Sequence, residues 1–253
     1  MMDWPVYLIN LDKDRARLEA ATAELARAGT SWQRIPAVNG RLLSAEEVAA
    51  VYDGKANRRY ARHPLTGPEI GCYLSHLRAW AAIRASGQPG GVVLEDDIRI
   101  SGDLPATLRA LAADDGTWDI AKLFSFRHDV TLLHERSLAP GLRLGTPYRV
   151  PSTTLAYAIR AEAAHRLLRL SQPFFRPIDE DHKFFWEKRL AIVQVDPLPV
   201  AMGKQDTSEG TVGEARRSAT RGDPRTALMR AWTGMRYQAS YAAGLHLRRL
   251  RQR

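Results

Sequence analysis

Residues 92–97 read Val92-Val93-Leu94-Glu95-Asp96-Asp97, three apolar residues followed directly by three acids. The apolar run predicts a short buried strand with the acids at its carboxyl end. In an open α/β sheet, ligands bind beyond the carboxyl ends of the strands. Side chains alternate along a strand, so we expect Glu95 and Asp97 to share a face while Asp96 points away. The acidic triplet therefore predicts a ligand site.

Three carboxylates this close repel one another unless a cation neutralises them. Ligands that are all oxygens suit Mg²⁺ or Mn²⁺, and substrate phosphates usually complete the shell of such an ion. We expect Asp97 to contact the metal directly, with Glu95 as a second ligand or, like Asp96, in support through water or a ribose. The alternative is a solvated turn in which two of the acids cap a helix.

Predicted strands and helices alternate outward from the triplet in both directions. The expected strands are 6–11, 32–38, 120–126, 153–159 and 192–195. The expected helices are 13–28, 45–51, 69–85, 103–113, 161–170 and 182–189. Residues 53–68 predict an exposed loop, and 128–150 fits loops and short strands. The alternation predicts an α/β fold with a mostly parallel central sheet.

The composition suits a soluble globular core, with 45% hydrophobic and 26% charged residues among 253. The single cysteine, Cys72, excludes an internal disulfide and a cysteine-cluster metal site. No run of eighteen apolar residues and no secretory signal pattern is found, so a cytoplasmic location is the default expectation. The net charge is +9, and residues 214–253 contribute ten arginines against two acids.

A second acidic segment, Pro177-Ile178-Asp179-Glu180-Asp181, comes late in the chain, at the expected entrance to a helix. One acid there is accounted for as a helix cap, and a neighbouring acid is a candidate general base. We favour Asp179 as the base, because it directly follows the rigid Pro-Ile pair, and Asp181 as the cap. The opposite assignment stays open.

Ser75 and His76 lie on the predicted helix 69–85, whose other side is apolar. Adjacent helical residues point about 100° apart, so this pair is poorly placed as a nucleophile and base. No G-x-S-x-G elbow, P-loop or G-x-G-x-x-G fingerprint occurs in the chain. A serine hydrolase, a P-loop enzyme and a fingerprint dinucleotide-binding protein are therefore disfavoured.

The ordered segments YLINLDKDRAR, RIPAVNG, GPEIGCYLSHLRAW, VVLEDDI, TTLAYAI and PIDED resemble glycosyltransferase family 25. The resemblance covers residues 6 to about 200. It implies a GT-A-like, Rossmann-like nucleotide-sugar fold over 1–205. It also implies inverting transfer of a hexose, commonly galactose from UDP-galactose, to a lipooligosaccharide, lipopolysaccharide or other surface glycan. Mn²⁺ or Mg²⁺ is the implied cofactor. Asn39 stands where the family usually has aspartate, and the basic loop 53–66 matches no family pattern.

The resemblance also implies which residues bind the UDP-sugar. Arg15 or Arg17 is expected to meet a phosphate, although a solvated helix face is an equal alternative for Arg17. The expected nucleotide-site residues are Asn10, Asp12, Arg15, Arg17, Ser75, His76, Glu95, Asp96 and Lys122.

Three other functions compete with a glycosyltransferase. A nucleotidyltransferase would need glycine and lysine in a loop after the first strand, and LINLDKDR has no glycine. A nucleic-acid-binding protein would need basic residues across the folded core, but the arginine excess lies in the last forty residues. A non-catalytic relative that keeps the fold for binding is disfavoured by the complete acidic triplet.

Residues 206–224 predict a flexible linker, and 225–253 a basic amphipathic helix. One face of that helix would carry Leu228, Trp232, Met235, Ala239 and Ala242. Apolar residues beside arginines are typical of a helix at an anionic membrane surface, which would place the protein at the inner face of the cytoplasmic membrane. The alternative is that the helix packs on the catalytic domain or on a second copy of the chain.

Overall fold

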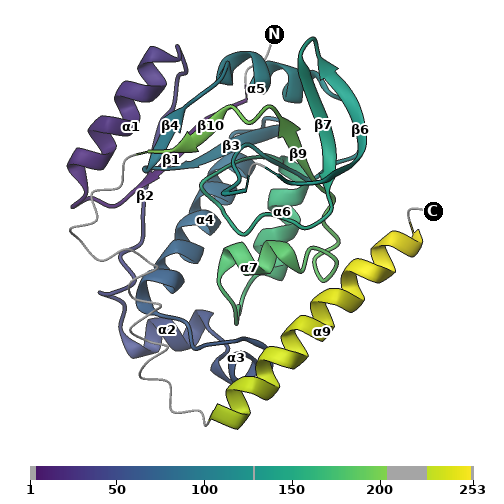
Figure 1. Cartoon of the computed structure of the whole chain (residues 1–253). Helices are drawn as coiled ribbons and strands as arrows, with labels where there is room; N and C mark the ends of the chain where they lie inside the picture. The colour runs from purple at the N-terminus through teal and green to yellow at the C-terminus, as the bar shows by residue number, and fades with distance from the viewer. Residues whose placement is uncertain (1–3, 128, 204–226, 252–253) are drawn as a thin grey trace.

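The computed structural model describes residues 4–127, 129–203 and 227–251. An eight-stranded sheet forms its centre, in the order β2-β1-β3-β8-β5-β9-β7-β6, with helices on both faces (Figure 1). Its strands are β1 (Val6–Asn10), β2 (Gln33–Pro36), β3 (Gly90–Glu95), β5 (Ile120–Lys122), β6 (Leu132–Ala139), β7 (Leu142–Pro147), β8 (Ala156–Arg160) and β9 (Ile192–Asp196). The helices are α1 (Arg15–Arg27), α2 (Ala45–Val51), α3 (Gly54–Tyr60), α4 (Gly67–Ala85), α5 (Leu104–Ala113), α6 (Ala161–Leu170), α7 (Ile178–Lys183) and α9 (Ala227–Arg251).

Alternating side chains of the central strands face two separate cores, as expected for a sheet covered on both sides. Val92 and Leu94 of β3 pack among buried residues of α1 and α5. Val93 lies on the opposite face, among buried residues of α4 and α6. Because both faces are buried, the strands read as continuous apolar runs in the sequence. The predicted α/β class is therefore confirmed.

The sheet is mixed, although a mostly parallel one was predicted. β2, β1 and β3 pair in parallel, and so do β5 and β9. β8 lies between β3 and β5 and is antiparallel to both, and β7 is antiparallel to β6 and β9. Six strands thus share one direction and two oppose it. The β6–β7 hairpin falls in the region 128–150, where loops and short strands were expected, and it reverses the chain without the helical crossover that parallel pairing needs.

A second sheet of two short strands, β4 (Ile98–Ile100) and β10 (Val200–Met202), begins directly after the acidic triplet and was not predicted. The backbone N–H of Gly203 donates a hydrogen bond to the carbonyl oxygen of Asp97 at 2.6 Å. The pairing of β4 with β10 therefore fixes the backbone at the end of the triplet.

Two predicted elements differ from the structure, and polar side chains decide the first of them. Residues 53–68 are not all loop: α3 begins after Asp53, whose carboxylate accepts hydrogen bonds from two backbone N–H groups. Its buried side chain is Asn57, which donates to the Phe175 carbonyl oxygen, so no apolar pattern marked it. α7 spans Ile178–Lys183 rather than 182–189, with Pro177 at its N-cap position, so Asp181 is not an N-cap.

The loop after β2 touches the first turns of α4 backbone to backbone. A Cβ atom on Gly71 would lie 2.6 Å from the Gly40 nitrogen, and one on Gly40 would lie 2.8 Å from the Gly71 nitrogen. The Ser75 hydroxyl fastens the same contact, accepting from the Val38 N–H at 2.8 Å and donating to the Gly71 carbonyl oxygen at 2.6 Å. The two segments RIPAVNG and GPEIGCYLSH therefore form one packed unit.

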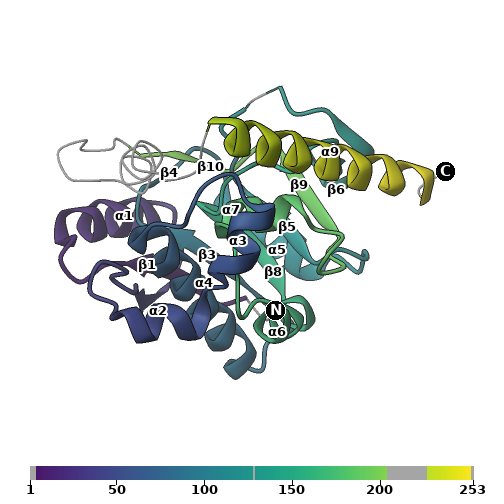
Figure 2. The ribbon, with the colours of Figure 1, turned by 90° about the horizontal axis from the view of Figure 1, so that it is seen from below.

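Helix α9 lies along α3 and packs against the α7 end of the molecule (Figures 1 and 2). Thr233, Tyr237, Tyr241 and Gly244 are buried, and Phe184 packs against the two tyrosine rings. The predicted apolar face is the outer one: Trp232 and Met235 are 60% and 59% exposed. The stated alternative, packing of this helix on the folded domain, is what the structure shows, through the face that carries Tyr237 and Tyr241. The predicted linker 206–224 lies outside the described residues.

Among the described ranges, no helix combines the length and apolar character needed to cross a membrane.

Candidate active site

The acidic triplet at the carboxyl end of β3 meets residues from the neighbouring strand β1 and from α1. The Asn10 amide donates a hydrogen bond to Asp96 Oδ2 at 2.7 Å, and Arg17 Nη2 lies 2.6 Å from Asp96 Oδ1. The same guanidinium lies 3.3 Å from Asp97 Oδ2. Asp96 and Asp97 therefore share one arginine, which differs from the predicted pairing of Asp97 with Glu95.

Burial raises the pKa of Asp96 to about 6, and the charges of Asp97 and Glu95 act in the same direction. Arg17 and the Asn10 hydrogen bond lower the pKa but do not cancel these effects. Three carboxylates, those of Glu95, Asp96 and Asp97, thus follow one another at the end of β3, and one guanidinium bridges two of them. A divalent cation with oxygen ligands fits such a cluster.

Glu95 turns to the opposite side, toward α4. His76 Nε2 lies 3.3 Å from Glu95 Oε1, and the Thr154 hydroxyl donates to the same oxygen at 2.6 Å. Burial alone would raise the pKa of Glu95, but these hydrogen bonds, with the charges of His76 and Arg17, lower it. Glu95 is therefore an anion held between α4 and the entrance to β8.

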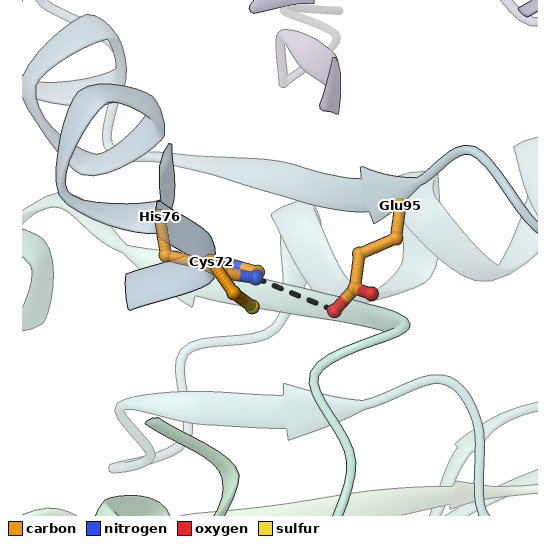
Figure 3. Close-up of side chains that lie close together, drawn as sticks. All are labelled: Cys72, His76 and Glu95. Carbon is orange, nitrogen blue, oxygen red and sulfur yellow. Dashed lines mark hydrogen bonds and ion pairs between the residues drawn. The ribbon is translucent and has the colours of Figure 1, made fainter. Parts of the chain in front are cut away.

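Cys72 joins this pair from one helical turn below His76 (Figure 3). One ligand atom from each of Cys72, His76 and Glu95 lies within 4.8 Å of the others. Burial and the charges of Glu95 and Asp179 raise the pKa of the thiol well above its usual value. Cys72 is therefore a neutral thiol unless a cation reaches it.

Lys122 of β5 is fully buried, and its amine donates to the Thr153 carbonyl oxygen at 2.6 Å. The amine lies 3.3 Å from His182 Nδ1 of α7. Burial lowers the pKa of Lys122 to about 7, against the opposing charges of Asp179 and Glu95. The His182 pKa falls well below its usual value because of burial and the Lys122 charge. Lys122 therefore lies within electrostatic reach of both acidic segments.

The two candidate bases on α7 have different surroundings. The Asp181 carboxylate is buried, accepts a hydrogen bond from Tyr73 and pairs with Lys188 and Arg176. Asp179 is half-buried, and its charge acts on both Lys122 and Cys72. The charge of Asp179 thus acts on Cys72 and Lys122, two groups near the acidic site. The Asp181 carboxylate is instead bound to interior partners.

Three other residues predicted for the nucleotide site, Asp12, Arg15 and Ser75, have other partners or are exposed to solvent. Asp12 is exposed and pairs with Arg34 at 2.6 Å, and Asp14 holds the N-cap position of α1. Arg15 is exposed on α1. The hydrogen bonds of Ser75 hold the loop after β2, as described above, and no contact joins Ser75 to the triplet.

Several residues of the site were not singled out from the sequence. Tyr157 donates to or accepts from His76 Nδ1 at 2.9 Å and accepts from the Trp80 indole at 2.8 Å. Thr154 and Cys72 contact the site as described above. The signal was present in the segments TTLAYAI and EIGCYLSH, but only the three-dimensional pairing of β8 with β3 shows which side chains meet.

The fold and the site together define an α/β protein of Rossmann-like form, with a charged site beyond the ends of its central strands. The chain belongs to glycosyltransferase family 25: the sequence model of that family, described as an LPS biosynthesis protein, matches residues 3–181.

Similar proteins carry both active and inactive names. The human "Inactive glycosyltransferase 25 family member 3" is 30% identical over 78% of this chain and 36% of its own length. A family-25 member of Anopheles gambiae is 31% identical over 69% of this chain and 30% of its own length. Procollagen galactosyltransferase 1 of Danio rerio is 28% identical over 69% of this chain and 30% of its own length. The chain thus spans about a third of these relatives.

Proposed function

We propose that the protein is an inverting glycosyltransferase that moves a hexose from a UDP-sugar, with Mn²⁺ or Mg²⁺ as cofactor, to a glycan or glycolipid acceptor. The observation that carries the proposal is the geometry of the triplet at the carboxyl end of β3, where Asp96 and Asp97 share Arg17 and Asn10 donates to Asp96. Membership of family 25 supports glycosyl transfer as the reaction. The carboxylates of the triplet support a bound cation beside the anionic diphosphate of the donor.

Asp97 is the carboxylate that would hold the ion, with Asp96 supporting through its bonds to Asn10 and Arg17. Glu95 would serve as the second ligand by turning its carboxylate from His76 and Thr154 toward Asp97. When bound, the ion supplies Lewis-acid stabilisation of the leaving diphosphate. Arg17, at the start of α1 and 44% exposed, is the protein cation placed to share that charge. Lys122 adds a second cation on the side of α7.

Asp179 is the proposed general base. The acceptor hydroxyl attacks the anomeric carbon opposite the leaving diphosphate, and its proton passes to the Asp179 carboxylate. Asp181 is unsuited to this step, because its oxygens are already engaged by Tyr73 and Lys188 in the interior. Its role is to fix α7, and with it the direction of Asp179.

Galactose is the proposed sugar, because relatives at 28–29% identity are named procollagen galactosyltransferases. The family description supports a lipopolysaccharide or lipooligosaccharide as the acceptor. The outer face of α9 supports work at a membrane, since Met229, Trp232, Met235 and Leu247 are each more than half exposed. We therefore place the reaction at the anionic inner face of the cytoplasmic membrane, on a lipid-linked acceptor.

The test is release of UDP from a panel of UDP-sugars, with and without a chelator. One sugar hydrolysed far faster than the others, only with added Mn²⁺ or Mg²⁺, would support the proposal and identify the donor. Equal rates with and without chelator would contradict the metal requirement. No UDP release from any UDP-sugar, with no metal-dependent UDP binding by calorimetry, would place the chain with the relatives named inactive.

A further inference from the structure

The donor set around Cys72 differs in chemistry from the acidic triplet. It offers a sulfur, an imidazole nitrogen and one carboxylate, whereas the triplet offers oxygens only. Zn²⁺ prefers sulfur and nitrogen ligands, and Mg²⁺ and Mn²⁺ prefer oxygen. We propose that Cys72, His76 and Glu95 form an inhibitory Zn²⁺ site that competes with the catalytic cation for Glu95. The binding part stands alone, and the inhibitory part rests on the proposed function.

The geometry requires little movement. Zn²⁺ ligand distances of 2.0–2.3 Å place neighbouring donor atoms of a tetrahedral site about 3.3–3.8 Å apart. His76 Nε2 and Glu95 Oε1 are already separated by 3.3 Å. Cys72 precedes His76 by four residues on α4, so both side chains lie on one face of the helix. In Figure 3 the sulfur and the imidazole point toward the same Glu95 carboxylate.

A second shell of hydrogen bonds orients two of the three ligands. The Trp80 indole donates to the Tyr157 hydroxyl, which lies 2.9 Å from His76 Nδ1 and so fixes the plane of the ring. The Thr154 hydroxyl fixes Glu95 at 2.6 Å. Such outer-shell partners are what hold metal-binding histidines and carboxylates in place.

Protons and charge balance on binding. The Cys72 thiol loses its proton to solvent, and the Zn²⁺ charge stabilises the thiolate among the carboxylates that otherwise disfavour it. His76 binds through Nε2, so in the zinc-bound form its one proton lies on Nδ1, next to the Tyr157 oxygen at 2.9 Å. Cys72 and Glu95 are half-buried while His76 is buried, so the accessible side of the site is the one formed by Cys72 and Glu95. Water completes the shell there, as in zinc sites with three protein ligands.

The competition follows from one shared residue. Glu95 is the proposed second carboxylate for the catalytic ion, and the same side chain completes the Cys72 and His76 pair. Zn²⁺ at the triad therefore withdraws Glu95 from the triplet. Cys72 itself has no place in the proposed transfer reaction, so its removal separates the two sites.

Co²⁺ is a suitable probe of the binding part, because a thiolate ligand to Co²⁺ gives a charge-transfer band in the near ultraviolet. The full chain titrated with Co²⁺ should develop this band, and one equivalent of Zn²⁺ should abolish it. Cys72→Ser should lack the band, which is diagnostic since Cys72 is the only cysteine. Asp97→Asn should retain it. Absence of the band in the wild type, or its loss in Asp97→Asn, would overturn the site.

Calorimetry of Zn²⁺ binding gives the magnitude. Loss of second-shell partners alone weakens metal binding 10–100-fold, so Cys72→Ser should weaken it by at least about 100-fold. In the UDP-release assay with Mn²⁺, Zn²⁺ should inhibit the wild type. For Cys72→Ser the inhibiting Zn²⁺ concentration should rise by the same factor as the loss of Zn²⁺ affinity measured by calorimetry. Equal inhibition of both proteins would overturn the inhibitory role. If the wild type shows no turnover, the Co²⁺ and calorimetric results still decide the site, independently of the proposed function.

Discussion

Asp181 of α7 and Lys188, seven residues further along the chain, form an ion pair in the interior, and Tyr73 and Ser171 hydrogen-bond to its two members. Asp179, only two residues before Asp181, is half-buried and acts on Lys122 instead. One short helix therefore carries a stabilising acid and an acid available for chemistry.

Asp181→Asn should lower the free energy of unfolding by about 3 kcal/mol, because it leaves the Lys188 ammonium buried without its counter-charge. Asp179→Asn should change stability by less than about 1 kcal/mol and lower turnover roughly 100-fold or more, as expected for a general base. Urea unfolding and UDP release measured on both variants check this. A stable but inactive Asp181→Asn, beside an active Asp179→Asn, would reverse the roles.

Asp97→Asn should fold normally and lose metal-dependent UDP binding, since it removes a carboxylate that would hold the ion. A loss of at least about 100-fold in turnover is expected when this electrostatic stabilisation is removed. Calorimetric titration of UDP in the presence of Mn²⁺ is the measurement. Asp115→Asn is the matched control, because Asp115 is exposed and follows α5. Unchanged turnover in Asp97→Asn would remove Asp97 from the site.

Lys122 should make stability depend on pH, since its folded pKa of about 7 lies below the ordinary value of 10.5. Below pH 7 the amine is charged in both states, and the penalty of burying the charge is fully present. Above pH 7 the folded chain releases the proton first, so the free energy of unfolding rises with pH until about 10.5.

The expected rise between pH 7 and pH 9 is roughly 2 kcal/mol. Urea unfolding of Lys122→Met over this range should show no such rise relative to the wild type. Lys55→Met serves as the control, because Lys55 is exposed on α3. The same pH dependence of stability in wild type and Lys122→Met would contradict a lowered pKa of Lys122 as the cause of the rise.

Two glycines of α9 give a matched pair. A Cβ atom on Gly244 would come within 2.5 Å of the Trp186 ring, whereas one on Gly234 would meet nothing within 4 Å. Gly244→Ala should destabilise the protein by about 1–3 kcal/mol through overpacking. Gly234→Ala should stabilise it by up to about 1 kcal/mol through helix propensity. Thermal unfolding distinguishes them, and equal shifts would mean that α9 is not docked at Trp186.

Membrane binding through α9 is tested best by point variants. Removing the whole helix would also uncover Phe184, which packs against Tyr237 and Tyr241. Trp232→Ser with Met235→Ser should weaken binding to anionic vesicles more than tenfold, since each apolar side chain contributes about 2 kcal/mol when buried. Ala239→Ser is the control at an equally outward position. Co-sedimentation that is unchanged in the double variant, or equal on neutral vesicles, would contradict the proposal.

The sequence predicted most of the elements that bury apolar faces, because periodicity records burial directly. Helices α2 and α6 have the predicted bounds, and a capping box of Ser44 and Glu47 starts α2. The errors lie where polar side chains are buried. Asn57 anchors α3 through a buried hydrogen bond rather than an apolar face. Asp181 forms an ion pair with Lys188, which no local sequence pattern indicates.

The site was predicted in part for the same reason. The position of Glu95, Asp96 and Asp97 follows from one strand and a general rule of α/β sheets. Their partners follow from pairings between distant segments. The sharing of Arg17 by Asp96 and Asp97, and the meeting of Glu95 with Cys72 and His76, depend on how α1 and α4 cover opposite faces of the sheet.

The backbone contact of Gly40 with Gly71 has a consequence for recombining members of this family. A chimera with a crossover between these positions takes the loop after β2 from one parent and α4 from the other. Because neither position leaves room for a Cβ atom, such a chimera keeps the fold only if both parents supply glycine. Crossovers placed before Gln33 or after Ala85 keep the contact within one parental block. The helix that carries Cys72 and His76 then comes from the same parent as the loop it packs against.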